Sequence, residues 1–236
     1  MELRRLLVLA NSIKKGGRCV AGRVLEPGPG PGRALEWFRP VSEVGEGELL
    51  MADMRVAGKA KLLPFDVVHV PVSKHAGNAG HPEDWIVTGG LWQYERTADV
   101  ARVGALLEHP QDLWLEPNCK SDRVTPSFAR SLPKLQSLYL IRPDNLRIVL
   151  GQELSWDRSK TKWVRRARFG YQGVQYDFGM TDPEFTDQLP VKAPEVGHPF
   201  VEFPASFGDR SVLCVSLTPP FNGWHYKVVA TVLALP

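Results

Sequence analysis

The stretch SKTKWVRRARFGYQGVQYDFGMTD, residues 159–182, narrows the fold more than any other part of the sequence. Apolar and aromatic residues alternate with polar ones on both sides of Gln172-Gly173, which predicts a β-hairpin with its turn at that dipeptide. Successive side chains of a strand point to opposite faces. One predicted face of the first strand mixes rings with a charge: Trp163, Arg165, Ala167, Phe169 and Tyr171. The other is mainly cationic: Lys162, Val164, Arg166 and Arg168.

This hairpin combines the two kinds of side chain that hold single-stranded nucleic acid. Cations pair with phosphates, and aromatic rings stack on bases with little selection of sequence. The candidate contacts are Lys160, Lys162, Trp163, Arg165, Arg166, Arg168 and Tyr171. The alternative is structural, with Trp163 and Phe169 in a core and the cations protecting an edge strand from aggregation.

A second basic segment, NSIKKGGR at residues 11–18, lies between two predicted strands. Its candidate contacts are Lys14, Lys15 and Arg18, because two lysines beside two glycines favour a backbone concavity that receives a phosphate. The segment is not a P-loop, since the order GxxxxGK[ST] is missing and no helix follows. A solvated hairpin turn is the alternative.

Arg39 and a group of three histidines are the remaining candidates for a ligand site. Arg39 follows Trp37-Phe38, so we expect its guanidinium to lie against a ring and meet a base or phosphate. A packed aromatic with an arginine at its rim is the alternative. His69, His75 and His81 lie close in sequence but show neither HxH nor HExxH spacing. We therefore predict no metal site and no cofactor.

The composition is that of an ordinary folded protein, with 43% hydrophobic and 23% charged residues and a net charge of +3 in 236 residues. The cations gather in the two basic segments, which favours a polyanionic partner more than the net charge does. Three widely spaced cysteines fit neither a disulfide framework nor a zinc site, so we expect reduced thiols and a cytoplasmic protein. Without a signal-peptide pattern or a long apolar run, we expect no membrane association.

Short strand-like runs fill both ends of the sequence, and the two helical patterns, 97–109 and 126–132, lie in the middle. This order predicts a mostly β fold of two small OB-like β-barrels bridged by a short helical segment. The expected bounds are 1–95 for the first barrel, 96–134 for the bridge and 135–236 for the second barrel. OB barrels bind oligonucleotides or oligosaccharides, although a fold class alone does not choose the ligand.

Several phrases spread along the chain resemble a bacterial family of dual OB-containing domain proteins. Among them are LANSIKKGGRCVAG (9–22), WFRPVS (37–42), FDVVHVPV (65–72), YDFGMTDPEF (176–185) and LCVSLTPPFNGWHYKVVATV (213–232). The resemblance covers nearly the whole chain and implies two OB-like barrels with a role related to nucleic acid or nucleotides. It brings no catalytic residues with it.

Together these features favour a protein that binds single-stranded or structured RNA or DNA through a bipartite basic surface with aromatic stacking. One alternative is an adaptor subunit whose basic face meets a protein partner. Another is a nucleotide-processing enzyme with a pocket between the barrels. The sequence shows no catalytic residues, so it leaves open whether the protein is an enzyme.

Overall fold

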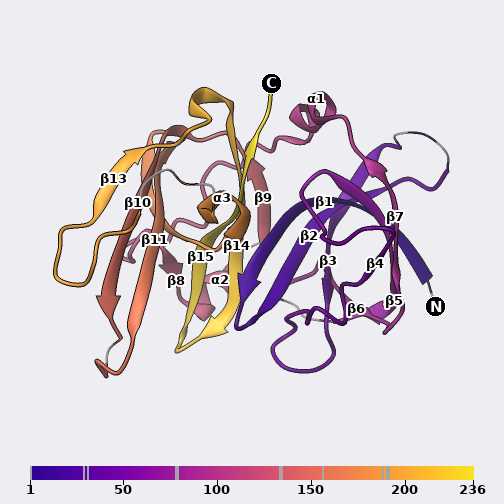
Figure 1. Ribbon diagram of the computed structural model, residues 1–236, viewed down its shortest axis with the longest axis horizontal. Helices are drawn as coiled ribbons and strands as arrows, with labels where there is room; N and C mark the ends of the chain where they lie inside the picture. The colour runs from indigo at the N-terminus through magenta and orange to yellow at the C-terminus, as the bar shows by residue number, and fades with distance from the viewer. Residues whose placement is uncertain are drawn as a thin grey trace. The chain divides into compact units, whose positions relative to one another are not determined.

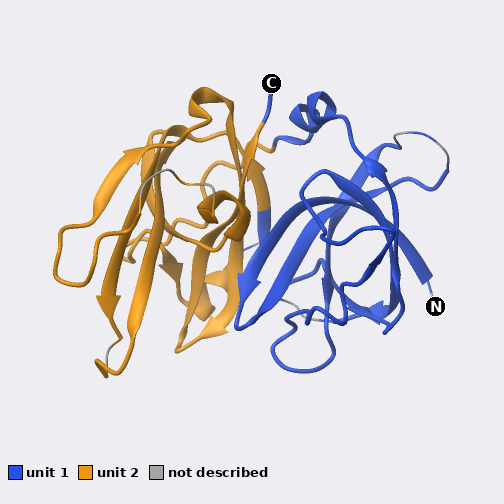
Figure 2. Cartoon of the chain, viewed as in Figure 1, with its two compact units in different colours: residues 1–107, 132–138, 235–236 blue, residues 108–131, 139–234 orange. Residues whose placement is uncertain are grey.

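The computed structural model describes residues 2–28, 30, 32–77, 80–132, 135–155, 157–187, 189 and 192–236. The chain forms two compact units (Figure 2). Unit 1 consists of Met1–Leu107, Leu132–Leu138 and Leu235–Pro236, and unit 2 of Glu108–Ser131 and Tyr139–Ala234. Strands account for 51% of the chain and helices for 9%, which confirms the mostly β class.

Unit 1 is built on one mixed sheet, with both antiparallel and parallel strand pairs, that curls into a barrel (Figure 1). Its strands are β1 (Glu2–Lys14), β2 (Gly17–Leu25), β3 (Ala34–Val41), β4 (Val56–Ala57), β5 (Asp66–His75), β6 (Asp84–Val87) and β7 (Trp92–Thr97). The order β1-β2-β3-β6-β5 returns to β1, because β5 also pairs with β1. Five strands therefore form a closed barrel, and β4 and β7 extend the sheet beside β5.

The long strand β1 closes this barrel by pairing on both sides. Its first part pairs with β5 from Glu2 to Leu7, and its later part pairs with β2 from Leu6 to Lys14. The β1–β2 register shifts between Val8 and Ala10, and a bulge of this kind bends a strand. At the bend the two backbones come so close that a Cβ on Gly22 would lie 1.8 Å from the Leu7 carbonyl oxygen.

The core of the first barrel follows from the alternation along its strands. Leu6 and Val8 of β1 point inward with Val20 and Val24 of β2, and the ring of Phe38 fills the space between them. Phe38 and Trp92 are completely buried in this cluster. The β-branched and aromatic side chains that favour strands are thus also the ones that fill the barrel.

Unit 2 is built on an eight-stranded sheet in the order β13-β10-β11-β12-β15-β14-β9, with β8 paired to β15. The strands are β8 (Arg123–Val124), β9 (Leu138–Ile141), β10 (Asp144–Leu154), β11 (Thr161–Tyr171), β12 (Val174–Met180), β13 (Val201–Pro204), β14 (Ser211–Phe221) and β15 (Trp224–Ala234). Only two residues, Arg142 and Pro143, separate β9 at one edge from β10 near the other. This short stretch of chain therefore contributes strands to both ends of the strand order in its sheet.

The predicted hairpin at 159–182 is confirmed as β11 and β12. Gln172 and Gly173 have φ values of 50° and 76° at the turn, which suits a tight hairpin connection. The rings of Phe169, Tyr176 and Phe178 pack on its inner face, with centroids 5.4 to 5.7 Å apart. Part of the aromatic content of the hairpin thus belongs to the core of unit 2.

The helical elements are short: α1 (Val100–Val103) with its 3-10 continuation η1 (Gly104–Leu106), α2 (Pro126–Ser131), α3 (Pro183–Asp187) and η2 (Gly208–Arg210). The prediction of a helix over 97–109 is wrong in extent, because Thr97 still pairs with Asp66 in the sheet and Asp99 caps α1 instead. The predicted start of α2 at Pro126 is confirmed. None of the helices in the described part of the chain is long and apolar enough to cross a membrane.

Replacing Gly22 by alanine tests whether the close approach of β1 and β2 holds the first barrel. The added Cβ would collide with the Leu7 carbonyl, so we expect Gly22→Ala to lower the free energy of unfolding by about 3 kcal/mol, measured by urea denaturation. A Cβ added to Gly89 would meet no other atom within 4 Å, so Gly89→Ala serves as the control. Equal stabilities of the two variants would contradict the prediction.

Candidate functional site

The cationic face of β11 is neutralised by carboxylates from other segments of unit 2. Three arginines and three acids alternate there: Arg147, Glu202, Arg168, Asp177, Arg166 and Asp122. Arg168 lies 3.0 Å from Asp177 and 2.6 Å from Glu202, and Arg166 lies 3.1 Å from Asp122. Hydrogen bonds from Arg147 and Arg168 also hold the pKa of Glu202 below its usual value. We call this set the arginine ladder; Arg123 also pairs with Asp122 at 2.9 Å, so the three acids meet four arginines in all.

Tyr171 and Arg39 both lie inside their units. Tyr171 is 4% exposed, and its hydroxyl donates to the Pro110 carbonyl at 2.9 Å, so no base can stack on the ring without rearrangement. Arg39 is also 4% exposed and belongs to β3 of the first barrel. Both side chains can be buried for the same reason: the polar group at the end of each one forms a hydrogen bond within the protein, which offsets the cost of removing it from water.

Arg39 is held by a buried cluster of polar side chains in unit 1. Its Nε donates to Asp84 at 2.6 Å, and its Nη2 lies 3.3 Å from a Glu83 carboxylate oxygen. Glu83 accepts a hydrogen bond from Ser137 and lies 3.9 Å from the ring of His81. Burial opposes the charge on Glu83, but His81 and Arg39 keep its pKa below the usual value. Arg39 is thus engaged by two carboxylates inside its own unit.

The basic turn between β1 and β2 is occupied by an acidic neighbour. Lys15 forms an ion pair with the Glu46 carboxylate, and Lys14 donates to the Glu46 carbonyl. Lys15 and Gly16 have φ values of 45° and 85°, as a tight hairpin turn requires. Arg18 is half-buried, and its Nη1 atom is buried without a hydrogen-bond partner. The two lysines of this turn thus bind Glu46, whereas the Nη1 atom of Arg18 makes no hydrogen bond.

The free end of the β10–β11 hairpin carries the exposed aromatic and basic side chains. Residues 166–171 of β11 pair with β12, whereas residues 161–165 pair only with β10. Trp163 is 52% exposed in this part, and the guanidinium of Arg165 lies 5.6 Å from the centre of its ring. Lys160, just before the strand, and Lys162, on the opposite face of the strand, are also exposed, and Glu153 lies 3.4 Å from Lys162.

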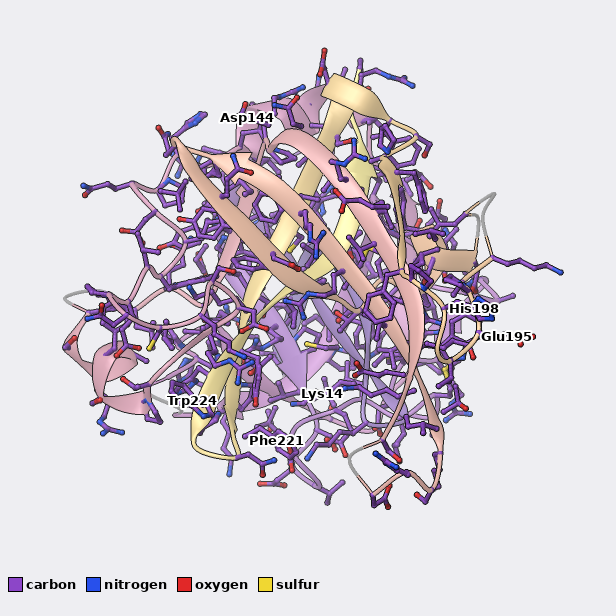
Figure 3. The ribbon with its side chains drawn as sticks, turned by 90° about the vertical axis from the view of Figure 1, so that its left-hand side faces the viewer. Lys14, Asp144, Glu195, His198, Phe221 and Trp224 are labelled. Atoms are coloured by element: carbon purple, nitrogen blue, oxygen red, sulfur yellow. The ribbon has the colours of Figure 1, made fainter. Side chains whose placement is uncertain are left out.

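The opposite face of the same hairpin end has a second exposed ring. Phe200 is 45% exposed and packs flat against Gly151, where a Cβ would come within 2.1 Å of the ring. A shallow groove of about 600 Å³ runs between residues 152–155 with Arg158 on one side and the loop 196–200 on the other. Figure 3 shows His198 and Glu195 together on this loop, and the His198 amide donates to the Glu195 carbonyl at 3.2 Å.

One carboxylate near the tip of this hairpin, that of Asp157, bonds to two serines. Asp157 accepts hydrogen bonds from the Ser155 hydroxyl and from both the amide and the hydroxyl of Ser159. These bonds lower its pKa to about 2, so it stays ionised at neutral pH. The fixed turn holds Lys160 at the start of the exposed strand segment, where Lys160 donates its amide to Ser155.

A sequence profile of a known family, described as the Dual OB-containing domain, matches residues 4–232. The chain belongs to the Dual OB-containing domain family. This confirms the resemblance read from the sequence and agrees with the closed barrel of unit 1. No curated protein and no solved structure shows significant similarity to the chain. OB barrels commonly bind oligonucleotides, so the family suggests nucleic-acid binding in general terms without naming a ligand.

In this Dual OB-containing domain protein the three candidate histidines do not converge. His69 lies 3.1 Å from Glu95, His75 contacts the Pro82 carbonyl at 2.6 Å, and His81 is buried beside Glu83. Within the described ranges, no group of three or more His, Cys, Asp and Glu side chains is placed to hold a metal ion. Each histidine thus has a local structural environment of its own.

A buried lysine in unit 2 escaped the sequence analysis. Lys227 is 1% exposed, and its Nζ lies 5.8 Å from the centre of the Phe178 ring. Burial lowers its pKa to about 8, although Asp112 and Asp122 act in the opposite direction. The alternation along β15 was the available signal, because Lys227 shares the inward face with His225 and Val229.

Removing Arg39 tests the buried cluster. Arg39→Met would leave Glu83 and Asp84 as buried carboxylates without their cation, so we expect the free energy of unfolding to fall by about 3–5 kcal/mol. The matched control is Arg33→Met, because Arg33 is 76% exposed and its ion pair with Glu26 is at the surface. A loss for Arg39→Met as small as that of the control, in urea denaturation, would contradict the prediction.

The pH dependence of stability tests the environment of Lys227. Between pH 8 and pH 10.5 the folded chain has released the proton that the unfolded chain still binds, so stability rises with pH. We expect the difference between the wild type and Lys227→Met to change by about 3 kcal/mol over this interval, in favour of the wild type. Lys162→Met is the control, because that side chain is 67% exposed. A difference that stays constant with pH would contradict the prediction.

Proposed function

We propose that the protein binds single-stranded nucleic acid with the free end of the β10–β11 hairpin in unit 2. The observation that carries the proposal is the half-exposed ring of Trp163, with Arg165 against it. Lys160 and Lys162 are exposed at the same end of the hairpin, Lys162 on the opposite face of the strand. A ring of this kind offers a stacking face to any unpaired base, and the cations pair with the adjoining phosphates.

The distribution of charge supports this end of the hairpin over its middle. Residues 152–165 contain four cations, Arg158, Lys160, Lys162 and Arg165, against two acids, Glu153 and Asp157. The arginine ladder, with Arg123 on its Asp122, holds four cations against three acids, and each of these cations is in an ion pair. A larger surplus of positive charge attracts a polyanion more strongly, whereas a network of paired charges mainly stabilises its own geometry.

The secondary structure favours a single strand over duplex DNA as the ligand. Proteins that read duplex DNA through its major groove commonly insert a helix of several turns. The longest α-helix among the described residues is α2, with six residues. An exposed aromatic ring on a strand suits unpaired bases, which can leave their stack and lie on it.

Fluorescence anisotropy with a labelled single-stranded 12-mer tests the proposal. We expect Trp163→Ala to weaken binding about tenfold, because stacking on one ring contributes about 1–3 kcal/mol. For Lys160→Met with Lys162→Met, the slope of log K against log salt should become shallower by about 1.4, which is two phosphate contacts at about 0.7 each.

Phe221 provides the matched aromatic control. It is 49% exposed and lies beside Trp224 at the tip of the β14–β15 hairpin (Figure 3). We expect Phe221→Ala to leave the affinity unchanged. The proposal fails if the wild type does not bind in low salt, or if Phe221→Ala weakens binding while Trp163→Ala does not. A protein partner that co-purifies in equal amounts without nucleic acid would favour the adaptor alternative.

A further inference from the structure

A cavity of about 500 Å³ borders the core of the first barrel, in the unit that does not contain the proposed hairpin site. It lies among β1, β2 and the segment 51–62, with Leu91 at its side. Its polar lining consists of Asn11 and four cations, Arg18, Arg55, Lys59 and Lys61. Its volume falls in the range of small-molecule sites, which starts near 300 Å³.

The charge around this cavity is one-sided. No carboxylate is among the described residues that line it. Lys59 is paired with the buried Asp66 and lies 4.7 Å from the centre of the Tyr94 ring, so its charge is partly offset. Arg55 and Lys61 are exposed at the surface of the cavity, and Arg18 reaches it from β2. Several cations without an acid in the lining favour an anionic group.

Arg18 supplies the strongest single indication of a ligand. Its Nη1 atom is buried and has no hydrogen-bond partner, although a buried donor without a partner costs free energy. Its backbone is fixed by two hydrogen bonds of 2.8 Å with Leu49, so the arginine starts from a rigid position. Because Nη1 is buried, the guanidinium has to turn toward the cavity before an oxyanion there can accept the hydrogen bond that the protein leaves unmade.

The rest of the lining is apolar and partly open. Met51 is 68% exposed and Leu91 is 53% exposed, whereas Met54 and Leu62 belong to the buried core cluster. Methionine adapts its shape to a flat or irregular partner, and exposed apolar side chains beside cations suit a ligand with an anionic and an apolar part.

We propose that this cavity binds a nucleoside phosphate, with Arg18, Arg55 and Lys61 holding the phosphate and Met51 and Leu91 covering the base. The ligand is either a free nucleotide or the phosphorylated end of a strand, since both present the same chemistry. All of these residues belong to unit 1, so the site does not depend on the hairpin at Trp163.

Isothermal titration calorimetry with AMP, adenosine and inorganic phosphate tests the site on the full chain. We expect AMP to bind at least tenfold more tightly than adenosine, because only AMP engages the cations, and more tightly than phosphate, which lacks the base. Equal affinities for AMP and adenosine, or no binding of AMP at millimolar concentration, would overturn the proposal.

Variants locate the binding. Arg55→Met combined with Lys61→Met removes two exposed cations without disturbing the core, and we expect it to raise the Kd for AMP at least tenfold. Arg18→Met should also raise it, and its fold can be checked by thermal melting. The control is Lys74→Met with Arg102→Met, two cations with side chains 65% and 66% exposed that lie outside this lining. An unchanged Kd for Arg55→Met with Lys61→Met would overturn the assignment.

Two further titrations distinguish the sources of the ligand. A 5′-phosphorylated trinucleotide that binds more tightly than AMP, and loses affinity in Arg55→Met with Lys61→Met, identifies the end of a strand. Tighter binding of AMP identifies a free nucleotide. Trp163→Ala should leave AMP binding unchanged, so the outcome at this cavity is separable from the outcome at the hairpin.

Discussion

The pairing of β1 with both β2 and β5 is the constraint on which the first barrel depends. A closed barrel has no free strand edges, so its backbone hydrogen bonds are satisfied within the sheet and only its ends and loops remain for binding. The bend of β1 near Leu9 and the missing side chain at Gly22 allow this closure. The proposed nucleotide cavity lies where the segment 51–62 meets the resulting core.

A second physical theme is that cations on these sheets are neutralised wherever another segment can supply a carboxylate. Arg39 meets Glu83 and Asp84 inside unit 1, and the arginine ladder spans five segments of unit 2. Cations outnumber acids in two places. One is the free end of the β10–β11 hairpin, where pairing with β12 has ended. The other is the cavity in unit 1, where no acid is among the described residues of the lining. Both proposed sites therefore follow from the balance of charge around the cations, more than from the density of cations in the sequence.

The local features of the chain were predictable because they depend on neighbours in sequence. The hairpin turn at Gln172-Gly173 and the start of α2 at Pro126 each rest on backbone preferences of a few residues. The helix expected over 97–109 failed because Thr97 gains a strand partner in Asp66, and such long-range pairing overrides helix propensity. Lys227 was overlooked because a lysine on a strand normally faces water.

The sequence by itself determined the mostly β class, the family and the presence of a basic hairpin with aromatic rings, since alternation and turn residues act locally. Only the tertiary structure decided which of those side chains remain available. Arg166 meets Asp122 and Arg168 meets Glu202, acids that lie 44 and 34 residues away in the chain. Tyr171 likewise finds its partner in the Pro110 carbonyl, 61 residues away. Charge balance and burial depend on such distant partners, and for this reason the proposed binding surface is centred on Trp163.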